Sequence, residues 1–359
     1  MTEIYKYPKQ RENLLGASSV ISGLSESGIH YPAIWEDQND TVTQDNFNVQ
    51  TSQFWLDRDV PFAKDPQTWN NDMSEEEKEA LIKALVGLTV LDTRQGARGM
   101  PLISLHEQDE QVQAVLAWMG MMEHVHAKSY SKIFQSLIST EKINYYMKEW
   151  AINQKNLQYK VDKIVKVYES LWKPEITLQE RWRAKASSVA LESGLFYSGF
   201  YYPILLAGGH GGKDDSARMS DTNDIIIKII TDESVHGQYI GWLGWNDFTK
   251  FSPQEQKENE EWFVSFMKDL YENEVEYTKE VYSTLGLVED VLKYVRWNFN
   301  RVFQNLNLDV IFEEEKINPI IEAGINTGTR THDYFSRVGG YAKANSTPIT
   351  DKTFDMSRP

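Results

Sequence analysis

Apolar residues recur every three or four positions along most of this chain, which is the spacing of one face of an α-helix. Ser74 and Glu77 form a capping-box start for the first clear pattern, a stripe of leucines that we expect to end near Gly96 and Gly99. The helix that we expect from about residue 180 should end at Pro203, because proline cannot continue the helical hydrogen bonds. The pattern predicts further helices at about 110–137, 143–171, 180–202, 224–245, 254–284 and 288–306.

Strand patterns are almost absent, so the predicted fold class is all-α. No Pro/Gly/Ser-rich linker divides the chain, and we expect a single domain over residues 1–359. Residues 1–50 should form an irregular or partly helical N-terminal arm, and residues 207–222 have the composition of a loop. Residues 334–359 lack apolar periodicity, and we expect them to form a flexible C-terminal tail.

Two Glu-x-x-His motifs lie inside the helical patterns, and a single carboxylate precedes each of them. In chain order the residues are Asp92, Glu123, His126, Glu192, Glu233 and His236. Each falls on the apolar side of its expected helix; Asp92, for example, continues the row of Leu85 and Leu88. A bundle of four helices can aim six such ligands at one point, which is how these folds bind two iron or manganese ions.

The electrostatics of these positions favour the same interpretation. An unpaired carboxylate inside a core lowers the stability of the fold, because its charge loses hydration, and a neutral neighbour rarely offsets this loss. The apolar faces carry no Lys or Arg that would pair with all four acids, so two metal ions are the natural counter-charge. The Glu-x-x-His spacing alone is weak evidence, because a single such pair lies more often on a surface. The shared burial of the ligand faces is the stronger signal.

Charge, hydropathy and the lack of cysteine exclude several classes of function and site. The formal net charge of −16 argues against nucleic acid as a partner. No apolar run reaches the length of a membrane span, and the first residues lack the apolar core of a secretory signal, so we expect a cytoplasmic protein. The chain has no cysteine, so any metal must be held by oxygen and imidazole, and any thiol chemistry must take place on another protein.

Four segments, LTVLDTRQG, MEHVHAKSYSKIF, ALESGLFYSGFY and IIKIITDESVHGQYIG, resemble the radical-generating small (beta) subunit of class I ribonucleotide reductase, most of all its class Ib form. The resemblance covers roughly residues 50–245 and implies a ferritin-like bundle with additional helices, in which the six residues above bind two metal ions. It also implies that Tyr130 becomes the stable radical. Trp55, in QFWLDRDVP, would lie on the radical-transfer route, and Asp232 would link it to His236.

Tyr130 lies one helical turn beyond His126 on the same face, so we expect its phenol to lie close to the metals. A phenoxyl radical survives only where water and reductants are excluded. Phe196, Phe200 and Ile229 are placed to form that dry wall.

The resemblance implies partners as well. They are a second copy of the chain, a large catalytic subunit that reduces ribonucleotides to deoxyribonucleotides, and a flavodoxin-like activator for a manganese centre. The ligand set itself accepts manganese or iron. The tail would bind the large subunit through Phe354 and Met356, with Tyr341 relaying the radical. Because this reduction uses cysteines, a chain without cysteine would supply only the oxidising equivalent.

Two other functions stay open on the sequence alone. Another ferritin-like dimetal protein, such as an oxidase or a fatty-acyl desaturase, uses the same ligand order but needs neither the tyrosyl radical nor the route through Trp55 and Asp232. A helical interaction protein would bind no metal at all. Elemental analysis after reconstitution with manganese or iron separates this last function from the others.

Overall fold

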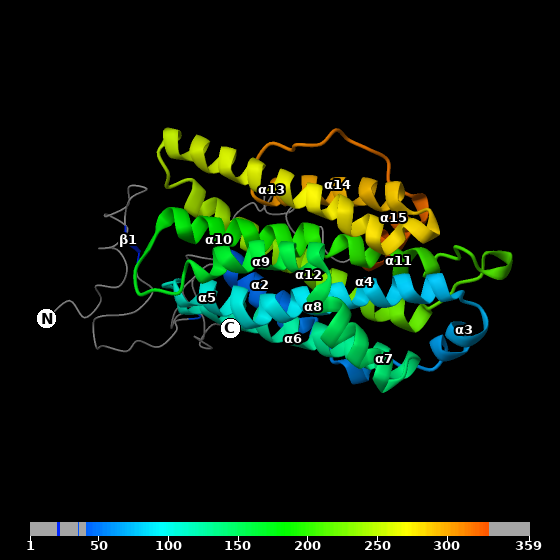
Figure 1. Ribbon diagram of the computed structural model, residues 1–359. Helices are drawn as coiled ribbons and strands as arrows, with labels where there is room; N and C mark the ends of the chain where they lie inside the picture. Colours follow the sequence, from blue (N-terminus) through cyan, green and yellow to red (C-terminus); the bar gives the residue numbers. More distant parts are fainter. Residues whose placement is uncertain (1–19, 22–34, 36–40, 330–359) are drawn as a thin grey trace, which may run out of the picture.

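The computed structural model describes residues 20–21, 35 and 41–329 (Figure 1). Within these residues the chain is almost entirely helical, as the apolar periodicity predicts. The α-helices are α2 (Thr41–Ser52), α3 (Asp65–Asn71), α4 (Glu75–Arg94), α5 (Met100–Leu105), α6 (Glu110–Leu137), α7 (Thr140–Tyr145), α8 (Ala151–Asn153), α9 (Lys155–Glu169), α10 (Leu178–Ala190), α11 (Tyr197–Ala207), α12 (Ser220–Phe248), α13 (Pro253–Tyr282), α14 (Val288–Asn305) and α15 (Pro319–Thr329).

Short elements interrupt or connect these helices. Three are π-helices, η2 (Gln95–Gly99), η3 (Tyr146–Trp150) and η4 (Leu191–Leu195), and three are 3-10 turns, η1 (Asp57–Asp59), η5 (Lys213–Asp215) and η6 (Ser283–Leu285). Two two-residue strands, β1 (Val20–Ile21) and β2 (Ile176–Thr177), pair antiparallel. No helix in the described ranges combines the length and the apolar character needed to cross a membrane.

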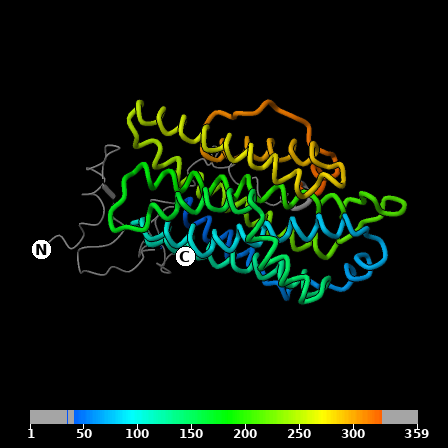
Figure 2. Tube along the Cα trace, viewed as in Figure 1, coloured from blue at the N-terminus to red at the C-terminus, as the bar shows by residue number. Residues whose placement is uncertain are grey.

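The long helices run side by side in an elongated bundle (Figure 1). α4 packs on α6, α10 packs on α12, and α11 contacts both α4 and α12. The yellow and orange stretch of the chain, α13 and α14, forms a further layer against this bundle (Figure 2). Large apolar side chains from all these helices form one continuous core. The helices that carry the predicted ligands are therefore neighbours around a common interior.

The helix starts follow local capping rules. The Glu77 backbone N–H donates to Ser74 Oγ at 3.2 Å, and the Ser74 N–H donates to Glu77 Oε2 at 2.9 Å, which confirms the predicted capping box. The side chain of Asp109 accepts from the first turn of α6 in the same way. These caps fix where α4 and α6 begin. They therefore also fix the position of the candidate ligands along each helix relative to its start.

Two aspartates cap each other's helices across the chain. Asp221 Oδ2 accepts from the backbone N–H groups of Ala63 and Lys64 at 2.7 and 2.6 Å. Asp65 Oδ1 accepts from the Asp221 N–H at 3.0 Å, and Asp65 Oδ2 accepts from the Thr222 N–H at 2.7 Å. This exchange holds the segment before α3 against the first turn of α12.

The first predicted helix does not end at Gly96 and Gly99. α4 instead continues through η2 into α5, which ends at Leu105. A Cβ at Gly96 would lie 3.0 Å from the Gly120 carbonyl oxygen of α6. Gly96 therefore serves the close approach of two elements and does not stop the helix.

Two other boundaries differ from the prediction. The helix expected at 143–171 is broken at Gln154, whose backbone is extended and whose side chain caps α9 by accepting from the Leu157 N–H at 3.0 Å. The helix expected to stop at Pro203 continues to Ala207. Every residue of α11 from Tyr197 to Leu206 is buried, so packing on all sides outweighs the hydrogen bond that proline cannot donate.

The segment after Asn305 contains a helix that the sequence pattern did not predict. α15 buries Ile321 and Ile325, one turn apart, against the bundle. The loop expected at 207–222 is present up to the start of α12. It is held by the buried Arg218, whose Nη2 lies 2.7 Å from Glu77 Oε1 at the start of α4. The predicted tail, 334–359, lies outside the described residues.

Candidate metal centre

The structure brings all six sequence-predicted ligands together inside the bundle. They come from α4 (Asp92), α6 (Glu123 and His126), η4 (Glu192) and α12 (Glu233 and His236). None of the six is more than 1% exposed. Two of the four carboxylates lie at π-helical distortions, because Glu192 is inside η4 and Asp92 lies just before η2. Such distortions are frequent at functional sites, since they redirect side chains out of the regular helical array.

The ligand atoms form two groups of four, and within each group all of them lie within 4.8 Å of one another. Asp92 and His126 belong to one group, Glu192 and His236 belong to the other, and Glu123 and Glu233 belong to both. The shared pair comes from α6 and α12, which face each other across the core. Two metal ions could be held here, one by each group, with Glu123 and Glu233 able to offer oxygens to both.

Both histidines present Nδ1 to the cluster. His126 Nδ1 lies 3.0 Å from Glu233 Oε1 and 3.4 Å from Asp92 Oδ1. His236 Nδ1 lies 3.0 Å from Glu123 Oε1. The two imidazole rings lie 6.1 Å apart and nearly parallel. One belongs to each group of four ligand atoms. Each metal position therefore has one nitrogen donor.

The cluster concentrates negative charge in a dry interior. Burial raises the pKa of Asp92 and Glu192 well above the usual carboxyl range, and the charge of Glu123 adds to the effect on both. Burial alone would lower the pKa of His126 and His236, but the carboxylates facing them outweigh it, and both pKa values are raised well above normal. The interior thus favours any cation that compensates its carboxylates.

The donor atoms have no other use in the fold. Both carboxylate oxygens of Asp92, Glu123 and Glu233, and Nδ1 of both histidines, lack a hydrogen-bond partner among the described residues. Buried polar atoms without partners are rare in native cores and call for an explanation. Two divalent cations would balance the four carboxylates, and oxygen and imidazole donors suit manganese and iron. The residues therefore fit a dimetal centre.

Tyr130 lies at the edge of this cluster with its side chain fully buried. Burial raises the pKa of its phenol well above normal, and the negative charge of Asp92 raises it further. Its hydroxyl has no hydrogen-bond partner within the described part of the chain. Phe196, Phe200 and Ile229, which we expect to form a dry wall, are each 0% exposed.

Trp55 and Asp232 connect to the cluster by a different histidine from the one we expected. Trp55 Nε1–H donates to Asp232 Oδ2 at 2.7 Å, and the same oxygen lies 3.0 Å from His126 Nε2. The expected link from Asp232 to His236 was wrong, because Asp232 faces α6 and not its own neighbour one turn along α12. The Trp55 and His126 rings are nearly parallel at 5.8 Å. A carboxylate on the outer nitrogen fixes the orientation of a ligand histidine.

Sequence reasoning missed one residue of the site, Gln95. Its side-chain amide donates to Glu192 and to Ser188, and it is fully buried. The available signal was its position three residues after Asp92, which puts a polar amide beside a ligand on an apolar face.

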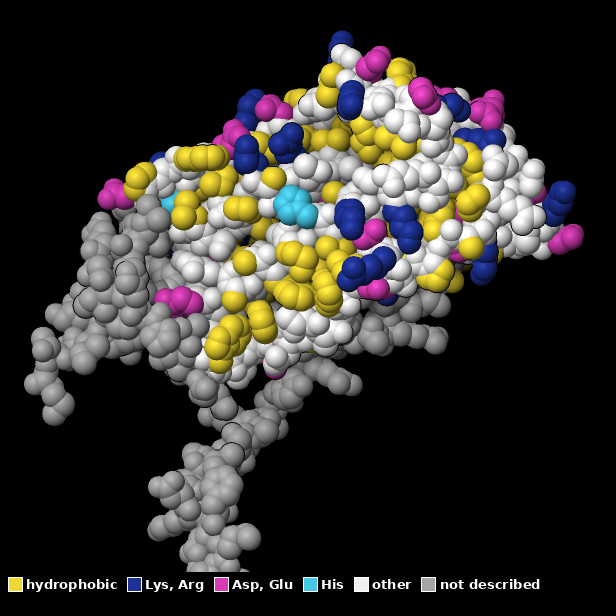
Figure 3. Space-filling view, turned by 90° about the horizontal axis from the view of Figure 1, so that it is seen from below, with side chains coloured by type: hydrophobic (Ala, Val, Ile, Leu, Met, Phe, Trp, Pro, Cys, Tyr) yellow, Lys and Arg dark blue, Asp and Glu magenta, His cyan; other side chains and the backbone are white. Residues whose placement is uncertain are grey.

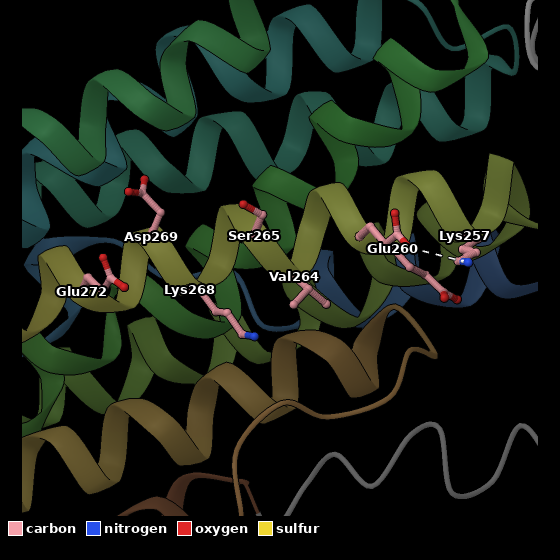
Figure 4. Close-up of a pocket in the computed structure, with 8 residues that line it drawn as sticks. Lys257, Glu260, Val264, Ser265, Lys268, Asp269 and Glu272 are labelled. Atoms are coloured by element: carbon pink, nitrogen blue, oxygen red, sulfur yellow. Dashed lines mark ion pairs between the residues drawn. The ribbon is translucent and has the colours of Figure 1, made fainter. Parts of the chain in front are cut away.

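Two hollows on the described surface are lined by none of the six candidate ligands. A hollow of about 760 Å³ is lined only by α13, and Figure 4 shows its charged side chains spread along the outside of that helix. Between its lining residues, an ion pair joins Lys257 to Glu261 at 3.9 Å. Charges of both signs on an exposed helix face are ordinary solvated surface. The second hollow, along α5 and α6, is apolar.

Comparison with known proteins places this site in a family. The profile described as ribonucleotide reductase, small chain, matches residues 34–319. The ribonucleoside-diphosphate reductase subunit beta of Bacillus phage SPbeta is 43% identical over 329 residues, which cover 91% of this chain and 96% of that protein. The Bacillus subtilis (strain 168) subunit beta is 42% identical with the same coverage. The crystal structure of Streptococcus sanguinis dimanganese(II)-NrdF has a TM-score of 0.75 and 35% identity, covering 82% of this chain and 100% of that one.

The chain belongs to the ribonucleotide reductase small-chain family. It is a small (beta) subunit of ribonucleoside-diphosphate reductase, and its relatives include class Ib proteins. The expected family and the all-α, ferritin-like fold are thereby confirmed. A beta subunit implies an alpha subunit as its partner. The alternative functions as an oxidase, a desaturase or a metal-free interaction protein are set aside.

Proposed function

We propose that this subunit forms and stores a radical on Tyr130 and supplies it to the alpha subunit. One observation carries the proposal: the Tyr130 hydroxyl is fully buried beside the dimetal cluster and has no hydrogen-bond partner in the described structure. A buried phenol without a structural role needs another reason to be there. Oxidation by the adjacent centre is a reason consistent with the family.

Two bound metal ions would supply the oxidising equivalent for this phenol. The protein's part is to keep the phenol dry and protonated until it is oxidised. Burial raises the pKa of the Tyr130 phenol, so the hydroxyl keeps its proton at neutral pH in the resting protein. The fully buried Phe196, Phe200 and Ile229 would form the dry wall that keeps water and reductants from the product.

The route away from the cluster would use Trp55, Asp232 and His126. Trp55 Nε1–H points at Asp232 Oδ2, so the indole can give its proton to this oxygen as its electron moves. His126 Nε2 holds the same oxygen from the other side and so keeps the acceptor oriented. The carboxylate therefore couples proton movement at the indole to the ligand histidine.

We propose manganese as the working metal, with iron as the alternative, and a flavodoxin-like protein as its activator. The Streptococcus sanguinis relative was solved with two manganese(II) ions, which supports this choice. The test is to load metal-free protein with Mn(II) or Fe(II), expose it to oxygen with and without the activator, and record low-temperature EPR and metal content. We expect a tyrosyl signal that Tyr130→Phe lacks at equal metal content. Loaded wild-type protein without any such signal would contradict the proposal.

We propose that two copies of the chain pair along the outer face of α6. η2, α5 and α6 line an apolar hollow of about 730 Å³, where Leu105 is 39% and Met121 is 36% exposed. Beside it, the 46%-exposed Phe54 packs edge-on against Trp118 of α6. Figure 3, which views the molecule from below, shows hydrophobic side chains gathered on this side. A contiguous apolar surface of this kind marks an interface, and identical patches pair readily about a twofold axis.

The pairing is tested by a charge on this face. Met121→Glu should shift sedimentation velocity from dimer to monomer, because it would put two carboxylates into an apolar contact. Ile152→Glu is the matched control, since Ile152 is 62% exposed on α8, away from the hollow, and this variant should stay dimeric. A dimer of undiminished stability with Met121→Glu would remove α6 from the interface.

We propose that residues 334–359 bind the alpha subunit through Phe354 and Met356 and that Tyr341 relays the radical. These residues lie outside the described residues, so the support comes from the sequence and the family. Tyr341 directly follows Gly339 and Gly340, and glycine accepts backbone conformations that other residues rarely adopt.

A further inference from the structure

The four carboxylates of the cluster are not equivalent. Asp92, Glu123 and Glu233 have both oxygens free of hydrogen bonds within the described structure. Glu192 has only Oε2 free, because its Oε1 accepts a hydrogen bond from the side-chain amide of Gln95. One ligand is thus held by the protein at one of its two oxygens, whereas the other three offer both oxygens to the metals.

The amide of Gln95 is fixed at three points. Besides donating to Glu192, Nε2 donates to Ser188 Oγ at 2.7 Å. On its other side, Gln95 Oε1 accepts from the Tyr168 hydroxyl at 2.7 Å. An ionised carboxylate can only accept, so the amide NH2 faces Glu192, and the amide oxygen on the other side accepts from the Tyr168 hydroxyl. The side chains of Tyr168 and Gln95 are both fully buried, so solvent does not compete for these bonds.

The backbone makes room for this contact. Gln95 opens η2, the π-helix that follows the ligand Asp92, and Gly99 closes it. A Cβ at Gly99 would collide with Gln95 Oε1 and would lie 2.9 Å from the ring of Tyr168. Any larger residue at this position would push the amide and the phenol apart. The glycine therefore has a packing role specific to the Tyr168–Gln95 pair.

We propose that Gln95 is a positioning residue that makes Glu192 a one-oxygen ligand of the metal position that carries His236. With Oε1 held by the amide, Oε2 is the oxygen turned to the cluster, and it lies 3.5 Å from His236 Nδ1. The other position, with Asp92 and His126, has no such restraint, so the two positions differ in the freedom of their outer carboxylate. This inference rests on the proposed dimetal function and adds a residue to it.

The experiment is Mn(II) titration of metal-free protein, with free Mn(II) measured by EPR at room temperature and the bound pair measured at low temperature. Wild type should bind two ions per chain. Gln95→Met keeps the length of the side chain but removes the donor, and we expect one of the two ions to bind about 10- to 100-fold more weakly. The other ion should keep its affinity, and the low-temperature spectrum of the bound pair should change shape because Glu192 is free to use both oxygens.

Ser188→Ala is the matched control, since it removes the other acceptor of the same amide and leaves the bond to Glu192. Both ions should then bind as in wild type. If Gln95→Met does not fold, Tyr168→Phe decides the question, because it releases the amide oxygen and should weaken the same single ion to a smaller degree.

Loss of affinity at both positions, or wild-type affinities and an unchanged spectrum, would overturn the role of Gln95. Wild-type protein that binds no pair of ions would instead overturn the dimetal function itself.

Discussion

Replacing Tyr130 with Phe should abolish the radical without loss of stability. The hydroxyl is fully buried, and none of the described residues offers it a hydrogen bond, so folding removes its water without replacement. An unsatisfied buried polar group costs about 1–3 kcal/mol. Phenylalanine removes this penalty and leaves the ring packing in place. We expect metal-free Tyr130→Phe to have an unfolding free energy between the wild-type value and about 2 kcal/mol above it.

Tyr168→Phe is the control for this substitution. Tyr168 is equally buried, but its hydroxyl donates to Gln95 Oε1 at 2.7 Å. The change removes a hydrogen bond and leaves the amide oxygen unpaired, so we expect a loss of about 1–3 kcal/mol. The same chemical deletion should therefore act in opposite directions at the two positions.

The assay is urea unfolding of metal-free protein followed by circular dichroism, with all variants at one protein concentration because subunit association contributes to the measured stability. Low-temperature EPR of the metal-loaded proteins gives the radical content. A Tyr130→Phe protein that is less stable than wild type by more than about 1 kcal/mol would refute the argument from the unpaired hydroxyl. A persisting phenoxyl signal would refute the assignment of the radical.

Three further outcomes follow from other contacts. Asp232→Asn should leave the Tyr130 radical in place but lower turnover with the alpha subunit about 100-fold or more, measured against Asp224→Asn as control. Burial raises the pKa of Asp247, but Arg181 and Lys185 outweigh it and hold this pKa well below normal, so its contribution is present above about pH 4 and is lost as the pH falls further. Asp247→Asn should cost about 3–5 kcal/mol at pH 7 and flatten the acid limb of the urea stability profile. Deleting residues 346–359 should abolish binding to the alpha subunit in a pull-down yet preserve the radical by EPR.

The ligand set could be predicted from the sequence because two independent periodic signals coincide. The Glu-x-x-His spacing puts Glu123 and His126 on one face of a helix, and the apolar row through the same face shows that this face is buried. Carboxylates on several converging apolar faces need a positive partner, and these faces carry no Lys or Arg that would pair with all four, so a pair of metal ions is the expected counter-charge. The sequence therefore predicted both that these six residues are buried and that they are candidate ligands. The structure places all six in the core, as expected.

Contacts between helices were harder to predict. Asp232 precedes His236 by one turn, so spacing within α12 favoured a link between them. The direction of the Asp232 side chain instead depends on how α12 is oriented relative to α6, which follows from the packing of both helices in the bundle. Gln95 was missed for a related reason. The role of Gln95 depends on the π-helix η2, and the periodicity of apolar residues in a single sequence does not predict such a distortion.

Helix ends were misread where tertiary packing overrides local preference. Pro203 ordinarily ends a helix, yet α11 passes through it because the residues around it are buried on every side. Gly96 was read as a stop signal, and the structure shows it instead at a close approach of η2 to α6. In both cases the usual local preference of the residue was applied correctly, but contacts with residues distant in sequence decided whether the helix ended there.

The contact between Trp55 and Asp232 depends on an anchor that carries no redox chemistry. Trp55 precedes α3 and Asp232 lies in the middle of α12, so their 2.7 Å hydrogen bond requires the two segments to be held in register. Asp65 and Asp221 supply that register by capping each other's helices, each with a buried carboxylate that accepts backbone N–H groups. Charged acceptors at helix N-termini are among the stronger local contacts. The geometry of the proposed route is thus held at one end by the candidate ligand His126 and at the other by two reciprocal helix caps.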